Sequence, residues 1–362
     1  MKIALLGDIA FYGKYSIDGN EDVFSYFKSV SDYLKDFDFV VGNLETPFVI
    51  NEKPHGYKSA YIKSDPVNVR LLNYLNINVV NLANNHIFDY GEKSYLLTKK
   101  LLTDFDIKYF GVEGKQVLLE VSGSKVALHG YCGYSTNPCG ISKDYGFGIN
   151  ELSLPRVEQN LKLNDKLGYL NIVSAHFGQE HVNYPCRDDI RMARQFSEIC
   201  PYILYGHHPH VMQGVEEING SVIAYSLGNL CFDDVYTRNS DKPLIKQSEN
   251  NKASFILELE ICGNNLVSHS ETPIYAGDES LVVNVDGVTA KLEAYTEKLS
   301  IDEVAYEKMR SELTREYIES RKKLRNLKFY LKRIKFRYFM MVLFGRLNKK
   351  RNTKNVKGFL ND

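Results

Sequence analysis

The sequence lacks the segments that mark membrane-spanning and secreted proteins. No stretch reaches the roughly 18–20 apolar residues that a transmembrane helix needs. The apolar run within the first six residues is too short for a signal peptide. The six cysteines form no Cys-x-x-Cys pair, which argues against a zinc ribbon or a disulfide framework and is compatible with a reducing compartment. Together these absences predict a cytoplasmic protein.

A net charge is also missing, because 45 Lys and Arg side chains balance 45 Asp and Glu side chains. The balance is uneven along the chain. Residues 301–362 hold 18 basic and 7 acidic side chains, which leaves 27 basic and 38 acidic ones for residues 1–300. The two parts carry charges of +11 and −11, so we expect two regions with different roles. We predict a globular domain over residues 1–290 and a basic helical tail over residues 291–362.

Short apolar strands alternate with helical segments in the globular region. Strands are predicted at 3–6, 37–41, 77–82, 108–110, 169–175, 202–205 and 281–285. Helices are predicted at 23–35, 65–75, 92–105, 154–167 and 191–199. Hairpins are predicted at 117–131, 215–225 and 253–273, and a mobile polar loop at 237–251. This order predicts an α/β core to which the second half of the chain adds antiparallel strands.

Polar residues that can bind metal ions follow several of the predicted strands. The strand at 202–205 is ended by Gly206 and followed by His207, His208 and His210, with Pro209 stiffening the loop. By itself this stretch could be a His-rich surface loop. Other strand ends carry candidates too: Asp8, Glu45, Asn85 with His86, and His176. Because α/β sheets bind ligands beyond the carboxyl ends of their strands, one shared site is predicted.

The chemistry of these side chains favours a metal centre. Carboxylates, an amide oxygen and imidazoles form a mixed oxygen and nitrogen ligand set that suits Mn, Zn or Fe and is large enough for two ions. Two such ions about 3.5–4 Å apart can clamp a phosphoryl group and lower the pKa of a bound water to about 7. His86 is placed to protonate a leaving alkoxide as a general acid, and Asp89 could orient its ring.

Six short motifs occur in order along residues 1–285. They are Gly7-Asp8, Asn43-Leu44-Glu45, Asn85-His86-x-x-Asp89-Tyr90-Gly91, His176-x-Gly178-x-Glu180, Gly206-His207-His208-Pro209-His210-Val211-x-Gln213 and Ser226-Leu227-Gly228-Asn229. As a set they resemble the capsule-synthesis A (CapA, poly-γ-glutamate capsule) family of calcineurin-like metallophosphoesterases. The resemblance implies a four-layer α/β/β/α sandwich with a metal site. It implies metal ligation by Asp8, Glu45, Asn85, His176, His208 and His210, an acid role for His86, and substrate contacts from Glu180 and Asn229.

The chain departs from the wider phosphoesterase superfamily at three points. Those enzymes open with Asp-x-His, but position 10 is Ala10 here. Their Gly-Asp-x-x-Asp motif is replaced by Gly42-Asn43-Leu44-Glu45, and their final Gly-His-x-His motif aligns with either His207 or His208. The first two changes could weaken or remove one metal position.

We therefore expect a metal-dependent hydrolase of the phosphoesterase type, acting in the biosynthesis of a bacterial capsule or another cell-surface polymer. Its substrate would be a phosphoester or an anionic polymer, and its partners would belong to the capsule synthesis machinery. The alternative is a non-catalytic scaffold that binds such a polymer or a synthase, and Ala10 favours it. A metal-dependent nuclease is a third possibility, supported only by the basic tail.

The tail is predicted to form one long helix from Tyr306. Apolar side chains keep near-heptad spacing along it, at Leu313, Tyr317, Leu324, Leu327, Leu331, Ile334, Tyr338 and Met341. Arg321–Arg337 is rich in Lys and Arg, and Phe336–Phe344 is apolar around almost the whole helix. We expect this helix to bind an anionic membrane surface, which would place the protein peripherally at the inner face of the membrane. A coiled coil or docking onto the globular domain is the alternative. Specific nucleic-acid binding has the least support, since nothing resembles a base-reading motif.

Overall fold

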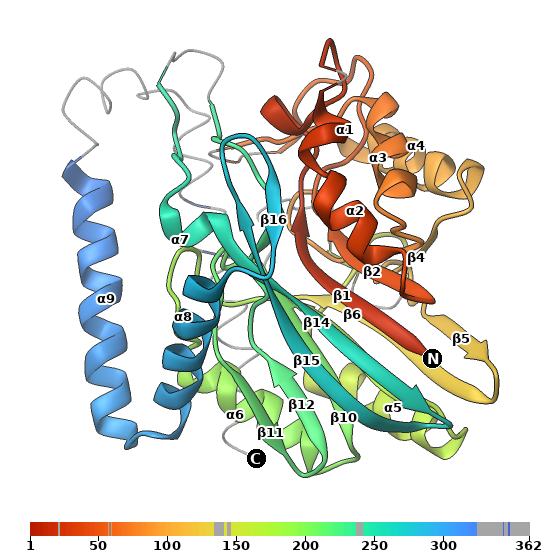
Figure 1. Ribbon diagram of the computed structural model, residues 1–362, viewed down its shortest axis with the longest axis vertical. Coiled ribbons are helices and arrows are strands. Elements are labelled where there is room, and N and C mark those ends of the chain that lie inside the picture. Colours follow the sequence, from red (N-terminus) through yellow and green to blue (C-terminus); the bar gives the residue numbers. More distant parts are fainter. Residues whose placement is uncertain are drawn as a thin grey trace.

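The computed structural model describes residues 1–20, 22–56, 58, 60–133, 141–142, 146–236 and 242–323, together with 343 and 347. Its strands form two large sheets and one small pair (Figure 1). The first sheet has the order β16-β15-β14-β1-β2-β3-β4, and β13 pairs with β1. Its strands are β1 Lys2–Ile9, β2 Phe39–Leu44, β3 Val79–Asn81, β4 Lys108–Phe110, β13 Asn229–Cys231, β14 Ala253–Cys262, β15 Asn265–Ala276 and β16 Leu281–Val283.

The second sheet has the order β11-β12-β10-β9-β6-β5. Its strands are β5 Val117–Val121, β6 Ser124–Cys132, β9 Leu170–His176, β10 Tyr202–His207, β11 Val215–Ile218 and β12 Ser221–Ala224. The small pair consists of β7 Ile141–Ser142 and β8 Ile149–Asn150. Strands β1 to β4 run parallel, as do β6, β9, β10 and β12. The predicted α/β core with added antiparallel hairpins is therefore present.

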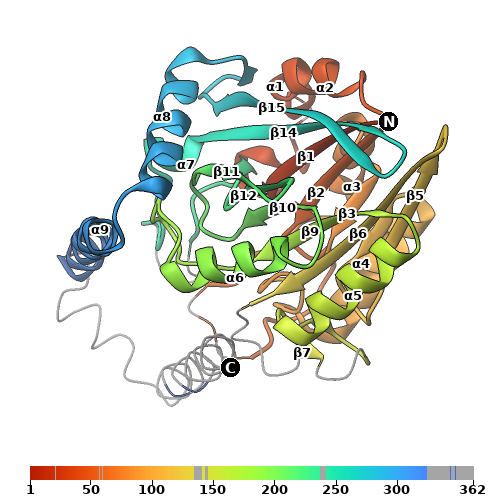
Figure 2. The ribbon, with the colours of Figure 1, turned by 90° about the horizontal axis from the view of Figure 1, so that it is seen from below.

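Helices cover the outer faces of both large sheets. On the first sheet lie α1 Val23–Tyr26, α2 Lys28–Leu34, α3 Val69–Tyr74 and α4 Gly91–Asp104. On the second lie α5 Leu154–Lys166 and α6 Arg187–Ser197 (Figure 2). The remaining helices are α7 Glu249–Lys252, α8 Asp286–Glu297 and α9 Glu303–Lys323, with 3-10 turns at Gly13–Tyr15, Pro66–Asn68 and Lys298–Ser300.

Three apolar clusters separate these layers. One lies between the two sheets and contains side chains such as Leu5 of β1 and Ile203 of β10. A second lies under the helices of the first sheet, and a third lies under α5 and α6. Strand β1 is buried on both faces, as its near-continuous apolar sequence predicts. The predicted four-layer α/β/β/α sandwich is confirmed.

The parallel strands bring their carboxyl ends to one region. Across β1 and its neighbours, Asp8 is in register with Asn43 on one side and Asn229 on the other. On the second sheet, His176 at the end of β9 is in register with His207 at the end of β10. The ends of β1 and β2 thus lie beside the start of β13 in the first sheet, and the ends of β9 and β10 lie side by side in the second.

Two glycines let the backbone pack tightly just before site residues. A Cβ atom on Gly7 would lie 1.9 Å from the carbonyl oxygen of Gly228, and one on Gly206 would lie 1.9 Å from that of Tyr225. Neither contact is sterically possible, so a side chain at either position would displace the strand that carries the next functional residue. Close backbone packing therefore explains the glycine in the Gly7-Asp8 motif and the one that begins the Gly206-His207 motif.

Some predicted elements differ in detail from the structure. The helix predicted at 23–35 is divided at Phe27, and the one at 65–75 begins as a 3-10 turn behind the Asp65 cap. Helix α6 starts at Arg187, four residues earlier than predicted. The end of the predicted loop at 237–251 is helical, because α7 begins at Glu249 within a capping box. Residues 237–241 of that loop lie outside the described residues.

Helix α8 was not predicted from the sequence. Its Val288 and Leu292 pack into the cluster between the sheets, but its other side chains are largely exposed, so its apolar stripe is short. The domain boundary predicted at residue 290 lies within this helix. The division into residues 1–290 and 291–362 stays a prediction.

The first part of the tail, α9, packs against the globular part. Tyr306 is fully buried and its hydroxyl donates a hydrogen bond to the carbonyl of Pro185. Arg310 donates to the carbonyl of Tyr184 and to the side chain of Gln179. The predicted apolar seam from Leu324 onward and the stretch Phe336–Phe344 lie outside the described residues, apart from position 343. In the described part of the chain, no helix is both long enough and apolar enough to cross a membrane.

Candidate metal centre

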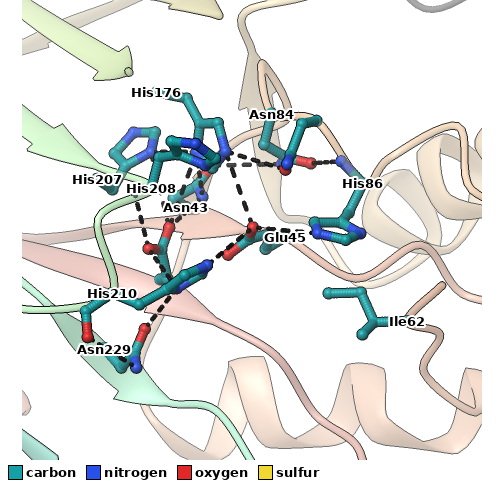
Figure 3. A network of polar contacts seen from close by, with 12 residues as sticks. Asn43, Glu45, Ile62, Asn84, His86, His176, His207, His208, His210 and Asn229 are labelled. Atoms are coloured by element: carbon teal, nitrogen blue, oxygen red, sulfur yellow. Dashed lines mark hydrogen bonds and ion pairs between the residues drawn. The ribbon is translucent and has the colours of Figure 1, made fainter. Parts of the chain in front are cut away.

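The predicted site residues are brought together between the two sheets. Asp8 comes from β1, Glu45 follows β2, and Asn85 and His86 follow β3. His176 ends β9, and the histidines at 207, 208 and 210 lie at or just beyond the end of β10 (Figure 3). All these side chains are buried. The sequence-based prediction of one shared cluster therefore describes the geometry of the structure.

One group of potential metal ligands consists of Asp8, His176 and His207. Asp8 Oδ1 lies 3.9 Å from His176 Nδ1 and 3.7 Å from His207 Nδ1, and these two nitrogens are 2.8 Å apart. Three further contacts hold the carboxylate. Asn43 donates to Oδ1 at 2.7 Å, the His208 backbone N–H donates to Oδ2 at 3.0 Å, and His210 Nδ1 lies 3.2 Å from Oδ2. The Nε2 atom of His207 lies 2.7 Å from Ser174 Oγ, which leaves Nδ1 directed at the carboxylate.

A second group consists of Glu45, His208 and His210. Glu45 Oε1 lies 3.8 Å from His210 Nε2, and also 3.8 Å from Nε2 of both His86 and His176. Neither carboxylate oxygen accepts a hydrogen bond from any described residue. A fully buried carboxylate without donors is energetically costly, so this arrangement fits a bound cation.

The structure separates the two histidines whose alignment the sequence left open. His207 belongs to the group around Asp8, whereas His208 belongs to the group around Glu45. The loop that follows His207 is strained, since His208 has φ of 101° and His210 has φ of 57°. The sequence left open which of the two is a ligand, because both stand in the same Gly-His-His-Pro-His motif.

Asn85 and His176 connect the two groups. The Asn85 side-chain oxygen lies 3.1 Å from His176 Nε2, the nitrogen that also faces Glu45. The other ring nitrogen of His176 faces Asp8 and His207. His176 is therefore placed to serve either group, and Asn85 lies against it; metal ligation by Asn85 stays a prediction.

Burial and opposite charges shift the titration of these groups. For Asp8, burial raises the pKa, but the hydrogen bond and charge of His210 outweigh it and hold the pKa well below its usual range. For His210, burial lowers the pKa, but Glu45 and Asp8 raise it to about 10. Burial, and then the charge of Asp8, raise the pKa of Glu45 well above its usual range. Two buried carboxyl groups thus lie beside one imidazolium, an arrangement that favours the charged form of Asp8 and the neutral form of Glu45, and a divalent cation would favour the charged form of both.

The predicted acid His86 is held by a carboxylate and a lysine. Its Nδ1 atom lies 2.6 Å from Asp89 Oδ2 and 3.0 Å from Lys58 Nζ, while Nε2 faces Glu45. Burial lowers the pKa of His86, and Asp89 opposes this shift. The pKa of Asp89 is lowered because His86 and Lys58 outweigh its burial. Lys58 was missed, because a lysine in a polar loop has no local sequence feature that links it to His86.

The two predicted substrate-binding residues occupy different positions. Glu180 follows β9, and although burial raises its pKa, His208 and His181 lower it to about 2. Asn229 is buried, and its side-chain oxygen lies 2.9 Å from His210 Nδ1. In this structure Asn229 orients His210, and a direct substrate contact from either residue stays a prediction.

An apolar cluster occupies the position of the histidine that the superfamily motif would have. Ala10 is fully buried with Ile62, Phe232 and Val235. The Phe232 ring lies 4.4 Å from the ring of His210, so this cluster forms a wall beside the second ligand group. Ile62 lies near His86 on the same side (Figure 3).

The residues present fit divalent metal ions. In each group the potential ligand atoms all lie within 4.8 Å of one another, and each group combines one carboxylate with two imidazoles. Such ligands suit Mn, Fe or Zn. Fold and site together define a two-sheet α/β protein with a buried cluster of carboxylates and histidines that are spaced to hold a metal ion.

The comparisons with known proteins identify the family. A model described as "Bacterial capsule synthesis protein PGA_cap" matches residues 2–234, so the chain belongs to this family, and the family expected from the motifs is confirmed. The capsule biosynthesis protein CapA of Bacillus anthracis is 30% identical over 245 residues, which cover 64% of this chain and 60% of that protein. The PGA biosynthesis protein CapA of Bacillus subtilis (strain 168) is 28% identical over 262 residues, covering 68% and 67%.

Solved structures show more distant similarity. A hypothetical protein from Thermus thermophilus has a TM-score of 0.45 at 14% identity, covering 75% of this chain and 98% of that chain. A putative 5'-nucleotidase from Staphylococcus aureus also has a TM-score of 0.45, at 11% identity, covering 81% and 58%.

Proposed function

We propose that this protein is a metal-dependent hydrolase with a phosphoesterase-type site, acting in the synthesis of a bacterial capsule or another cell-surface polymer. The observation that carries the proposal is Glu45. Its buried carboxylate accepts no hydrogen bond from any described residue, yet three imidazole Nε2 atoms surround it at 3.8 Å. A group built only for stability would not leave so costly a charge unsatisfied.

The ligand roles follow from the two groups. One ion would be held by Asp8, His176 and His207, and the other by Glu45, His208 and His210. Two divalent ions would supply a clamp for a phosphoryl group and would lower the pKa of a coordinated water to about 7.

His86 would hold the proton for the leaving group. In the imidazolium form, Nδ1 donates a hydrogen bond to Asp89 Oδ2, and Nε2 would carry the second proton toward the cluster, where a substrate oxygen would lie. Asn229 keeps His210 in orientation through its side-chain oxygen. The apolar wall around Ile62 and Phe232 would exclude water from this side of the site.

The biological role is inferred from the relatives. Both Bacillus proteins are named for capsule or PGA biosynthesis, and the match spans about 60% of the length of the Bacillus anthracis relative. We propose a phosphoester or an anionic surface polymer as the substrate and the capsule synthesis machinery as the partner. The net acidic residues 1–300 would repel a polyanion, so the metal ions would be its main attraction.

A non-catalytic scaffold is the second candidate, favoured by the apolar cluster around Ala10. In that case the same groups would bind metal and the polymer without turnover. The two functions differ in hydrolysis by the wild-type protein and in the effect of replacing His86.

Metal content is the first test. We expect about two equivalents of Mn, Zn or Fe in the purified wild-type protein and their loss from a His208→Ala/His210→Ala double variant, measured by elemental analysis. No metal after reconstitution with each of these ions would contradict the hydrolase and leave a scaffold that binds the polymer without metal.

Hydrolysis is the second test. The Mn²⁺-loaded protein would be assayed with bis(p-nitrophenyl) phosphate, poly-γ-glutamate, single-stranded DNA and RNA. We expect turnover of a phosphoester or the polymer, reduced about 10²–10⁴-fold in His86→Ala with metal content unchanged. Metal binding without turnover of any substrate would favour the scaffold, and turnover of DNA or RNA alone would favour a nuclease.

Association of the tail with an anionic membrane surface is also proposed, on the basis of its sequence. We expect the full chain to co-sediment with liposomes that contain anionic lipid and a chain ending at residue 323 to bind them less. Equal binding by the two chains would contradict this role.

A further inference from the structure

Lys58 is a buried lysine whose ammonium group contacts three groups of one turn. Its side chain is only 6% exposed. Its Nζ atom lies 2.6 Å from the backbone oxygen of Asn85, 2.5 Å from Asp89 Oδ1 and 3.0 Å from His86 Nδ1. The turn that carries Asn85, a ligand expected from the sequence, and the proposed acid His86 is therefore bonded at both ends by one side chain.

The ammonium group of Lys58 forms a salt bridge with the carboxylate of Asp89, which is fully buried. Asp89 Oδ1 accepts from Lys58, while Oδ2 lies 2.6 Å from His86 Nδ1 and accepts from the backbone N–H of Ile62 at 3.0 Å. An ammonium group donates only, so the proton on His86 Nδ1 has Asp89 as its acceptor. The ring is thereby fixed with Nε2 toward the cluster.

The loop around Lys58 is bonded to the same turn on both sides. His55 donates its backbone N–H to the carbonyl of Asp89 at 2.8 Å, and Ile62 donates to the Asp89 side chain. Ile62 also belongs to the apolar wall beside the site. Lys58 thus lies at the centre of a segment that connects the wall to the turn of Asn85 and His86.

We propose that Lys58 is a positioning residue for the metal centre and the acid. By holding the backbone of Asn85 and the carboxylate of Asp89 together, it sets the distance between the Asn85 side chain and His176 and the direction of His86 Nε2. Hydrogen-bonded groups behind a metal ligand and its neighbours affect metal affinity and activity in this way. The proposal rests on the proposed function, and its test includes metal affinity, which does not depend on turnover.

A role in stability alone is the competing explanation, because an uncompensated Asp89 would destabilise any fold. Three variants separate the two roles. Lys58→Met removes the charge, Lys58→Arg keeps it with a different donor geometry, and a Lys58→Met/Asp89→Asn double variant removes the buried pair without leaving one charge alone. Lys99→Met is the matched control, since Lys99 is also largely buried and pairs with Glu113.

The experiment uses the full chain and measures three quantities for each variant. They are the thermal unfolding midpoint, the Mn²⁺ dissociation constant from electron paramagnetic resonance titration, and kcat and KM with bis(p-nitrophenyl) phosphate. For Lys58→Met and for the double variant we expect about 10–100-fold weaker Mn²⁺ binding or lower kcat. We expect KM to change less than kcat, partial recovery in Lys58→Arg, and wild-type values in Lys99→Met.

Two outcomes would overturn the proposal. One is a folded Lys58→Met or double variant whose Mn²⁺ affinity and kcat both lie within about twofold of the wild type. The other is an equal loss in Lys99→Met, which would show a general effect on stability. If the wild-type protein binds Mn²⁺ but turns over no substrate, the hydrolase proposal fails, and Mn²⁺ affinity alone decides the role of Lys58.

Discussion

Replacing Glu45 with Gln should stabilise the metal-free protein and weaken the metal-loaded one. In the structure the Glu45 carboxylate is fully buried, lacks hydrogen-bond donors among the described residues, and shares the interior with Asp8. A glutamine keeps the shape of this side chain, removes its charge and offers an amide that can donate to Asp8. The metal-free protein would therefore gain stability from a change that removes a proposed ligand.

The size of the gain follows from the cost of an unsatisfied buried group. That cost is about 1–3 kcal/mol, and larger for a charged group. With an unfolding entropy of about 2.1 cal/mol/K per residue over 362 residues, a gain of this size corresponds to about 1–4 °C in the melting temperature. With Mn²⁺ at 100 times the dissociation constant, the wild-type protein would gain about 2.7 kcal/mol from binding, and Glu45→Gln would lose most of that gain.

The effect should also depend on pH in a defined direction. The folded-state pKa of Glu45 is raised by burial and by Asp8, so its ionisation destabilises the folded state above the unfolded-state pKa of about 4.3. The gain in the free energy of unfolding of the metal-free protein from Glu45→Gln should therefore increase as the pH rises from 5 to 8 and decrease as the pH falls.

Differential scanning fluorimetry at pH 5 and pH 8, with chelator and with Mn²⁺, would measure these effects. Glu113→Gln is the matched control, because Glu113 is partly exposed and pairs with Lys99. The free energy of unfolding of this variant should fall by at most about 1 kcal/mol, with or without metal. A metal-free Glu45→Gln protein that is less stable than the wild type at pH 8 would refute the reasoning that Glu45 is an uncompensated charge.

Three further predictions concern the two ligand groups and the docked tail. Elemental analysis should show that His207→Ala and His208→Ala each lose about one of two metal equivalents, because the two histidines belong to different ligand groups. A variant that loses both equivalents, or keeps both, would contradict this division. Mn²⁺ binding at pH 7 should release at least about one proton, since His210 has a pKa of about 10 without metal and must be neutral to bind it. The affinity for Mn²⁺ should accordingly rise as the pH rises toward 10. Calorimetry in two buffers of different ionisation enthalpy would measure the proton release, and an affinity that does not depend on pH would exclude such a release. In denaturant titrations, Tyr306→Ala should lower the free energy of unfolding by about 3–5 kcal/mol because the ring is buried. Tyr306→Phe should lower it by about 0.5–1.5 kcal/mol, because only the hydrogen bond from the hydroxyl to Pro185 is lost. A loss under about 1 kcal/mol for Tyr306→Ala would contradict the docking of α9.

Much of the fold and cluster could be read from local sequence patterns. Apolar runs such as Leu170–His176 predict strands wherever they occur, and the rule that ligands gather beyond parallel strand ends needs only the order of elements. This is why Asp8, Glu45 and the histidines after β9 and β10 were expected in one place. Polar residues at the ends of these strands indicate the site, because charged side chains are rare in buried strands unless they serve as ligands or have a partner.

Local patterns were insufficient where several segments meet. Helix α8 has only a short apolar stripe, and its burial depends on the sheet edges against which it packs. The sequence identified the histidine pair at 207 and 208 but could not assign its members. His207 ends β10, whereas His208 has a positive φ in the loop beyond it, and only the tertiary structure shows which of them lies with Asp8 and which with Glu45.

The sequence by itself therefore determined the layer order, the family and most of the candidate ligands, since these depend on short-range periodicity and on motifs of a few residues. The tertiary structure alone decided the division into two ligand groups, the contact of α9 with the loop after β9, and the position of Lys58 behind His86. These features depend on contacts between residues that are tens to more than one hundred positions apart. Such contacts leave no local pattern, because the interaction of a buried lysine with a distant carboxylate depends on packing and not on its neighbours in the chain.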